Sequence, residues 1–277
     1  LLNIEPGDAV NAFIRCKNLD DAEFTLKHNL VFATKNGIIK KTPLSEYARV
    51  NIKGKKAILI REGDQVIGVE LTDGSAEILL ANRNGRAIRF NESTVRQMGR
   101  VSTGVRGMRI DEDGADEVVG MICMHPDDDK NVMVISENGF GKRSLLDGYR
   151  ITNRGGKGVK TMNITEKTGT VVAIKSVDDE NDLVIINRSG ITLRMRVADI
   201  RVMGRNTQGV RVINLEKRGD EIASVCCVDT DPEEEVVEAP ENPEELAPAP
   251  ADDEILENED PTDDDIKAEE SADEADE

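Results

Sequence analysis

Four short turns recur along this chain about fifty residues apart, and they constrain its fold more than any other feature. The turns are Asn36-Gly37, Asn84-Gly85, Asn138-Gly139 and Ser189-Gly190, whose glycines are separated by 48, 54 and 51 residues. Apolar residues stand five and seven positions before each glycine, as Phe32 and Leu30 do before the first. Period-two apolar residues leading into Asn-Gly predict a β-hairpin whose turn has a positive φ.

Two further landmarks follow every hairpin. A second glycine stands 17 residues after the first hairpin glycine and 19 residues after the others, at Gly54, Gly104, Gly158 and Gly209. An apolar strand pattern then begins, at Val66–Val69, Val118–Met121, Val171–Ile174 and Ile222–Val225. Because no helical period is visible, we predict an all-β fold made of propeller-like, four-stranded antiparallel blades.

The repeat also predicts the domain organisation. Within residues 25–229 we expect four blades, at about 25–75, 76–127, 128–178 and 179–229. Gly7-Asp8-Ala9-Val10 resembles Gly63-Asp64-Gln65-Val66, a late feature of a unit, so residues 1–24 are expected to end a truncated upstream blade and the chain to be a fragment. Residues 230–277 are rich in Pro, Glu, Asp and Ala, which predicts a disordered tail.

The net charge of −19 conceals two opposite parts. Residues 231–277 contain 23 of the 55 acidic residues but only Lys267 among the 36 basic ones. Residues 1–230 therefore hold 35 basic and 32 acidic side chains and are mildly basic.

The cations follow the repeat in two registers. The first register lies four residues after each hairpin glycine and contains Lys41, Arg89, Arg143 and Arg194. The second lies two residues after each second glycine and contains Lys56, Arg106, Lys160 and Arg211. Since a repeated sequence position becomes a repeated spatial position, both registers are predicted to line a basic rim that binds duplex DNA. The alternative is that each cation pairs with a nearby carboxylate on a solvated face.

The manner of DNA binding is also constrained. Seven aromatic residues and no Trp disfavour base stacking on single strands, and no recognition helix or zinc finger is visible. Phosphate contacts and DNA deformability should therefore dominate over sequence reading. With about eight phosphate contacts, the log–log salt slope of binding is expected to be roughly −7.

Two segments carry a resemblance to a known family. They are Val95-Arg96-Gln97-Met98-Gly99-Arg100 with Thr103-Gly104-Val105-Arg106-Gly107, and Val202-Met203-Gly204-Arg205-Asn206-Thr207-Gln208-Gly209-Val210. With the hairpin repeats they closely resemble the C-terminal domain of DNA gyrase A subunits, of the type IIA topoisomerases, over residues 1–229; the acidic tail is also typical of gyrase. The resemblance implies a β-pinwheel of six blades, here the last four and the end of another, whose rim wraps DNA with a fixed handedness.

The hallmark of that family is a gyrase box, Gln-Arg-Arg-Gly-Gly-Lys-Gly, in the first blade. The loop Thr152-Asn153-Arg154-Gly155-Gly156-Lys157-Gly158 matches its last five positions and departs at the first two. We interpret it as the corresponding loop of a later blade, with the box itself upstream. The resemblance implies DNA contacts by Arg154 and Lys157, and Gly155-Gly156 suit backbone packed close to phosphate.

No catalytic or metal-binding constellation is predicted within this chain. The four cysteines lack CxxC spacing, His28 and His125 are far apart, and Tyr47 and Tyr149 are expected to pack in loops. The resemblance implies an ATP-dependent topoisomerase holoenzyme, A2B2, in which the partners of this chain are the gyrase B subunits and a second gyrase A subunit. ATP and Mg²⁺ would act elsewhere in it, and no cofactor is expected here. It further implies a cytoplasmic, nucleoid-associated protein; no transmembrane run or signal peptide is visible in the sequence.

Alternatives remain at this point. The related C-terminal domain of topoisomerase IV has fewer and less regular blades, and a propeller could serve only as a protein-interaction platform. The tail is either a solubilising appendage or a tethered DNA mimic that competes for the basic rim.

Overall fold

The computed structural model describes residues 10–16, 19–49, 51, 54–111, 116–215 and 219–230. Residues 231–277 of the predicted tail and residues 1–9 of the predicted upstream remnant lie outside the described residues. The architecture below belongs to the unit that ends at Asp231.

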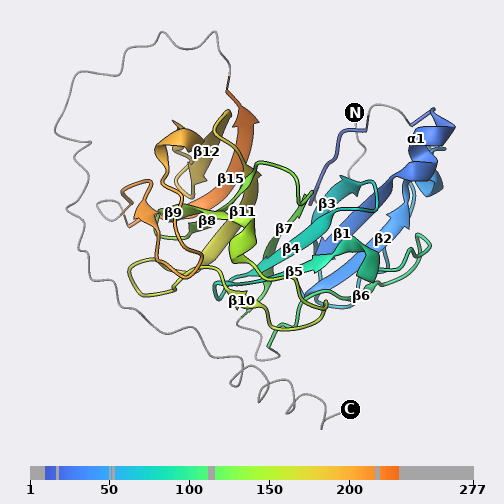
Figure 1. Ribbon diagram of the computed structural model, residues 1–277, viewed down its shortest axis with the longest axis horizontal. Helices are drawn as coiled ribbons and strands as arrows, with labels where there is room; N and C mark the ends of the chain where they lie inside the picture. Colours follow the sequence, from blue (N-terminus) through green and yellow to red (C-terminus); the bar gives the residue numbers. More distant parts are fainter. Residues whose placement is uncertain are drawn as a thin grey trace. The chain divides into compact units, whose positions relative to one another are not determined.

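Four antiparallel sheets make up this unit, as Figure 1 shows. The first sheet contains β1 (Asn29–Thr34), β2 (Ile38–Pro43), β3 (Val66–Thr72) and β6 (Val105–Arg106). The second contains β4 (Glu77–Asn82), β5 (Arg86–Asn91), β7 (Val118–Met124) and β10 (Val159–Lys160). The third contains β8 (Asn131–Ser136), β9 (Phe140–Leu145), β11 (Val171–Val177) and β14 (Val210–Arg211). The fourth contains β12 (Asn181–Asn187), β13 (Thr192–Arg196) and β15 (Ile222–Asp229). The predicted all-β, propeller-like fold is confirmed.

The hairpin prediction holds in detail. Leu30 and Phe32 lie buried on β1, and Gly37 donates its amide to the carbonyl of Thr34 at 3.0 Å. The four hairpin glycines have φ between 77° and 86°, and no described residue other than glycine has a positive φ. The glycine alone therefore supplies the left-handed step of each turn.

Short helices were not predicted. Asp21 caps α1 (Ala22–Lys27) by accepting amide bonds from Glu23 and Phe24. A 3₁₀ turn follows the second strand of every hairpin: η1 (Leu44–Tyr47), η2 (Glu92–Thr94), η3 (Leu146–Gly148) and η4 (Val197–Asp199). Elements of three to six residues are too short to show a periodic pattern in the sequence.

The second, third and fourth units each add a short strand to the sheet of the preceding unit. The two-residue strands β6, β10 and β14 each follow the second glycine of one unit and pair with β2, β5 and β9 of the preceding unit. Within the described residues no further unit offers a strand to β13, so the fourth sheet has three strands where four were predicted. The second glycines permit this pairing, because a Cβ on Gly158 would lie 2.4 Å from the carbonyl oxygen of Ala87.

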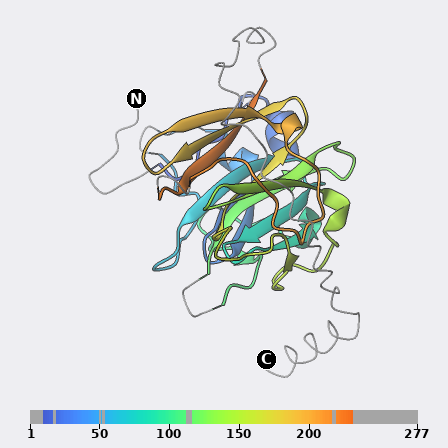
Figure 2. The ribbon, with the colours of Figure 1, turned by 90° about the vertical axis from the view of Figure 1, so that its left-hand side faces the viewer.

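The hydrophobic cores lie at the seams between sheets. The inner strands β3, β7, β11 and β15 contact one another in that order (Figures 1 and 2). One core joins Val31 and Ile39 of the first unit to Ile78 and Phe90 of the second, and equivalent cores fill the next two seams. Neighbouring units are thus held together by an apolar core between their sheets and by the short strand that the later unit adds to the earlier sheet.

Candidate nucleic-acid interface

Three of the four cations of the first register lie inside the protein. Lys41, Arg89 and Arg143 are only 6, 7 and 6% exposed. Side chains buried this far cannot reach a phosphate without moving, so the prediction that these three line an exposed rim is wrong. Arg194 differs, because its side chain is 37% exposed while it bonds Asp182 at 2.7 Å.

Arg89 shows what the first register does. Its Nε donates to Glu77 Oε2 at 2.7 Å, and its Nη1 donates to the carbonyls of Leu146 and Tyr149 at 2.8 Å each. Leu146 begins the η3 turn of the next unit, and Tyr149 caps the C-terminal end of that turn. Arg89 therefore fastens one unit to the next.

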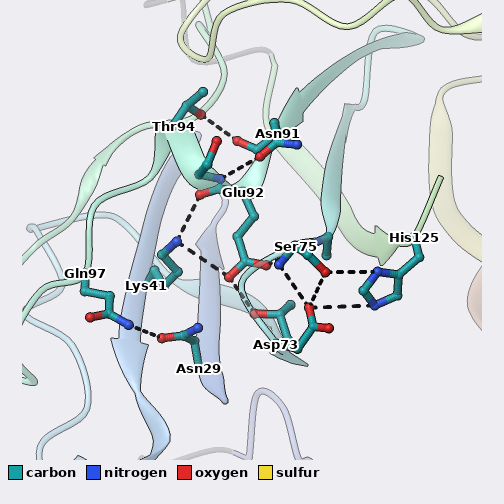
Figure 3. A network of polar contacts seen from close by, with 12 residues as sticks. Asn29, Lys41, Asp73, Ser75, Asn91, Glu92, Thr94, Gln97 and His125 are labelled. Atoms are coloured by element: carbon teal, nitrogen blue, oxygen red, sulfur yellow. Dashed lines mark hydrogen bonds and ion pairs between the residues drawn. The ribbon is translucent and has the colours of Figure 1, made fainter. Parts of the chain in front are cut away.

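Lys41 occupies the equivalent position one unit earlier, in the network drawn in Figure 3. Its Nζ donates to the carbonyl of Glu92 at 3.0 Å and lies 3.6 Å from the Glu92 carboxylate, which also accepts a bond from Thr72. Arg143 likewise donates to the carbonyl of Ile200 at 2.6 Å and pairs with Asp179. We call Lys41, Arg89 and Arg143 the seam latches.

The second register is exposed. Its four members, Lys56, Arg106, Lys160 and Arg211, all have exposed side chains. The last three stand on β6, β10 and β14, the strands that cross from one unit to the sheet of the preceding one. The backbone of these three residues is held at a seam, while their side chains are exposed.

A third register was not recognised in the sequence, although Arg154 was predicted to contact DNA as part of the gyrase-box-like loop. Arg100, Arg154 and Arg205 each stand four residues before a second glycine. Arg154 Nη1 donates to the carbonyl of Arg106 at 3.0 Å, and Arg205 Nη1 donates to the carbonyl of Lys160 at 2.8 Å. Two seams therefore bring an arginine of one unit beside a second-register cation of the preceding unit. Arg100 instead contacts Glu46, at 3.3 Å.

The gyrase-box-like loop lies at such a seam. The amide of Thr152 donates to Arg89 at 2.9 Å, the amide of Gly155 donates to Gly107 at 2.7 Å, and Asn153 and Lys157 are exposed. Gly156 accepts a bond from the amide of Arg109 at 3.0 Å. The glycine pair thus has a backbone-pairing role across the seam, whereas its packing against phosphate stays a prediction.

The other polar groups of the described residues form no recognisable catalytic arrangement. Tyr149 is fully buried and its hydroxyl lies 2.6 Å from Thr161 Oγ1; burial raises the pKa of the Tyr149 phenol. Ser75 donates to Asp73 at 2.8 Å and lies 3.4 Å from His125 Nδ1 at the surface (Figure 3), so its hydroxyl proton is held by the carboxylate. Within the described ranges, no three His, Cys, Asp or Glu side chains gather in a way that could hold a metal ion. The described helices also include none with the length and apolar character to span a membrane.

Comparisons with known proteins agree with the repeat. Residues 28–73, 76–123, 130–178 and 181–229 match the model of a family described as DNA gyrase C-terminal domain, beta-propeller. The DNA gyrase A subunit of Staphylococcus aureus is 43% identical over 239 residues, which make up 86% of this chain and 26% of that protein. The chain therefore spans far less than the full length of the curated relatives it matches.

Two solved structures resemble the fold. A C-terminal domain of DNA topoisomerase IV has a TM-score of 0.69 and 27% identity, and the match covers 76% of this chain and 64% of that one. A DNA gyrase A C-terminal domain has a TM-score of 0.70 and 23% identity, with 81% and 72% covered. Because the four matched segments cover most of the chain and agree with its four hairpin units, the chain belongs to the DNA gyrase C-terminal domain, β-propeller family.

Proposed function

We propose that this chain binds and wraps duplex DNA along its seams, without reading sequence, as the C-terminal domain of a gyrase A subunit. In that role it supports ATP-dependent negative supercoiling by a type IIA topoisomerase with two A and two B subunits. ATP, Mg²⁺ and the catalytic tyrosine act in other parts of that assembly. The proposal places the protein in the bacterial cytoplasm, at the nucleoid.

One observation carries the proposal: exposed cations recur at one structural position. Arg106, Lys160 and Arg211 stand on the crossing strands β6, β10 and β14, and Lys56 shares their sequence register. Arg154 lies beside Arg106, and Arg205 lies beside Lys160. Evenly repeated positive charge matches the evenly repeated phosphates of a duplex, and releasing condensed counterions drives such binding. Contacts of this kind position DNA but carry no sequence information.

DNA topology provides the test of wrapping. Nicked circular DNA ligated with the domain bound is expected to retain positive supercoils after the protein is removed, since a wrapped path of fixed hand stores writhe. Agarose gels with an intercalator give the sign and number of the supercoils. An unchanged linking number, at protein concentrations that saturate the DNA, contradicts the proposal.

A topoisomerase IV C-terminal domain is the second candidate. The observation in its favour is the structural likeness to such a domain at 27% identity. The topology test separates the two candidates. DNA binding with steep salt dependence but without retained writhe favours the topoisomerase IV role over gyrase-type wrapping.

The acidic tail is proposed as a tethered competitor for DNA. Residues 231–277 carry a net charge of −22, and tethering raises their effective concentration at the basic seams. Because β15 extends to Asp229, and Thr230 bonds Glu180 and Asp182, truncation should follow Thr230 and not interrupt the strand.

Truncation after Thr230 is expected to tighten duplex binding several-fold at low salt and to change it little at high salt, because the competition is electrostatic. Fluorescence anisotropy with a short duplex measures the effect. A matched full-length variant with the tail acids replaced by Asn and Gln separates charge from length. Equal affinity of the truncated and complete chains leaves the tail as a solubilising appendage.

A further inference from the structure

Two lysines are buried at equivalent positions of the repeat. Three residues after the hairpin glycines the chain has Lys40, Ile88, Lys142 and Leu193. Lys40 and Lys142 are 0% exposed. Fully buried lysines are rare, because an ammonium group needs hydrogen-bond partners to replace its water.

Lys142 finds its partners in the loop of the next unit. Its Nζ donates to the carbonyl of Gly204 at 2.8 Å, to the carbonyl of Arg205, and to Thr207 Oγ1 at 3.3 Å. Thr207 in turn donates its hydroxyl to Gly204 at 2.9 Å. The ammonium therefore lies on the inner side of the 204–207 turn and binds both ends of it.

Lys40 repeats the arrangement at the first seam. Its Nζ donates to the carbonyls of Ala57 and Arg100 at 2.6 Å each, and Arg100 is the loop arginine there. The middle seam differs, because Ile88 takes the lysine position and a Cβ on Gly156 would contact its side chain at 3.7 Å. The lysine is thus present at two of the three seams and is replaced by the apolar Ile88 at the gyrase-box-like loop.

Neither buried ammonium forms an ion pair with a carboxylate of the described residues. Burial, together with the Arg205 guanidinium, lowers the pKa of Lys142 to about 7. Burial, together with the Arg100 guanidinium, lowers the pKa of Lys40 to about 8. At each of these two seams, the loop arginine therefore disfavours the charged form of the buried lysine.

We propose that Lys142 is the positioning residue of the 204–207 turn, holding Arg205 and Lys160 around one DNA phosphate, and that phosphate binding there stabilises the charged form of Lys142. This inference rests on the proposed function. A phosphate beside Arg205 cancels the charge that opposes the ammonium, so DNA binding draws a proton onto Lys142. By reciprocity, a charged Lys142 tightens DNA binding.

The surroundings of Lys142 limit which other groups can titrate in its place. The loop presents Arg205, β14 presents Arg211, and the 3₁₀ turn of its own unit is followed by Tyr149. The arginines stay charged throughout, and the raised pKa of Tyr149 keeps its phenol neutral at neutral pH. Lys40, whose pKa is also lowered, lies in the first unit, and His28 and His125 belong to the first two units. All three have the same effect on wild type and on a Lys142 variant.

The test compares Lys142→Met with the wild-type chain in duplex binding from about pH 6.5 to about pH 9 at fixed ionic strength. At the acid end the variant is expected to bind about tenfold more weakly, because a rise of about one unit in the pKa of Lys142 on DNA binding corresponds to a tenfold change in affinity. The ratio of the two affinities should fall towards one at the alkaline end, where wild-type Lys142 is neutral. Lys130→Met, which removes an exposed lysine, should leave affinity the same at every pH.

A pH-independent ratio of the Lys142→Met and wild-type affinities overturns the inference, because a merely structural anchor weakens binding equally at every pH. If the variant does not fold, calorimetry compares the wild type with Lys142→Arg, whose guanidinium stays protonated. DNA titrations at one pH in two buffers of different ionisation enthalpy should report more proton uptake by the wild type. DNA binding without this additional proton uptake contradicts this inference alone, whereas no DNA binding at any pH contradicts the proposed function as well.

Discussion

Arg89→Met is expected to lower the free energy of unfolding by about 3–5 kcal/mol, because it breaks a buried ion pair from one side. Glu77 is itself 4% exposed and would keep its charge without a partner. The carbonyls of Leu146 and Tyr149 would also lose their donor at the seam. Urea denaturation followed by far-UV circular dichroism measures the loss, since the chain has no Trp for fluorescence.

Two matched variants control this experiment. Arg150→Met removes an exposed arginine close in sequence and should change stability by less than about 0.5 kcal/mol. The double variant Arg89→Met with Glu77→Met should recover part of the loss, because replacing both members of a buried pair by apolar residues relieves the unpaired charge. Equal stability of Arg89→Met and Arg150→Met contradicts the latch role.

The hairpins and inner strands could be predicted because their signals are local. Alternating apolar residues before a glycine, as at Val132 and Val134 before Gly139, specify strand, turn and buried face together. The strand exchange could not be predicted, since a two-residue strand such as β10 is defined only by its partner in another unit. Domain boundaries drawn through the sequence therefore place β10 in one unit although it completes the sheet of another.

The two registers of cations looked alike in the sequence and differ in the structure. A sign of the difference was present, because Glu77 precedes Arg89 by twelve residues and Asp182 precedes Arg194 by the same interval. Across an antiparallel hairpin that interval brings acid and cation together, and both pairs form. The partners in the next unit, such as the carbonyl of Ile200 for Arg143, depend on packing between units and carry no sequence mark.

Replacing the whole second register is expected to have the largest effect on DNA binding. The variant carries Lys56→Gln, Arg106→Gln, Lys160→Gln and Arg211→Gln, all at exposed positions. Losing four phosphate contacts makes the log–log salt slope less steep by about 3.6. Because counterion release ceases to drive binding near 1 M salt, binding at 0.1 M salt should weaken on the order of a thousandfold. Fluorescence anisotropy of a labelled duplex over a salt series measures both.

A control with the same change of charge is needed because net charge alone affects DNA binding. Four exposed cations outside the second register serve this purpose: Arg15, Lys27, Arg61 and Lys130. Replacing them by Gln should leave the slope within about one unit of wild type, because cations that touch no phosphate release no counterion. Far-UV circular dichroism confirms that both variants retain the fold.

The salt slope of duplex binding is the measurement that most directly tests whether DNA follows the second register of cations along the seams. We expect the slope of the second-register variant to be less steep by about 3.6 than the slopes of the wild type and the control variant, which should agree with each other. Equal slopes for the two variants would show that phosphates do not follow Lys56, Arg106, Lys160 and Arg211, and would contradict the seam as the path of the DNA.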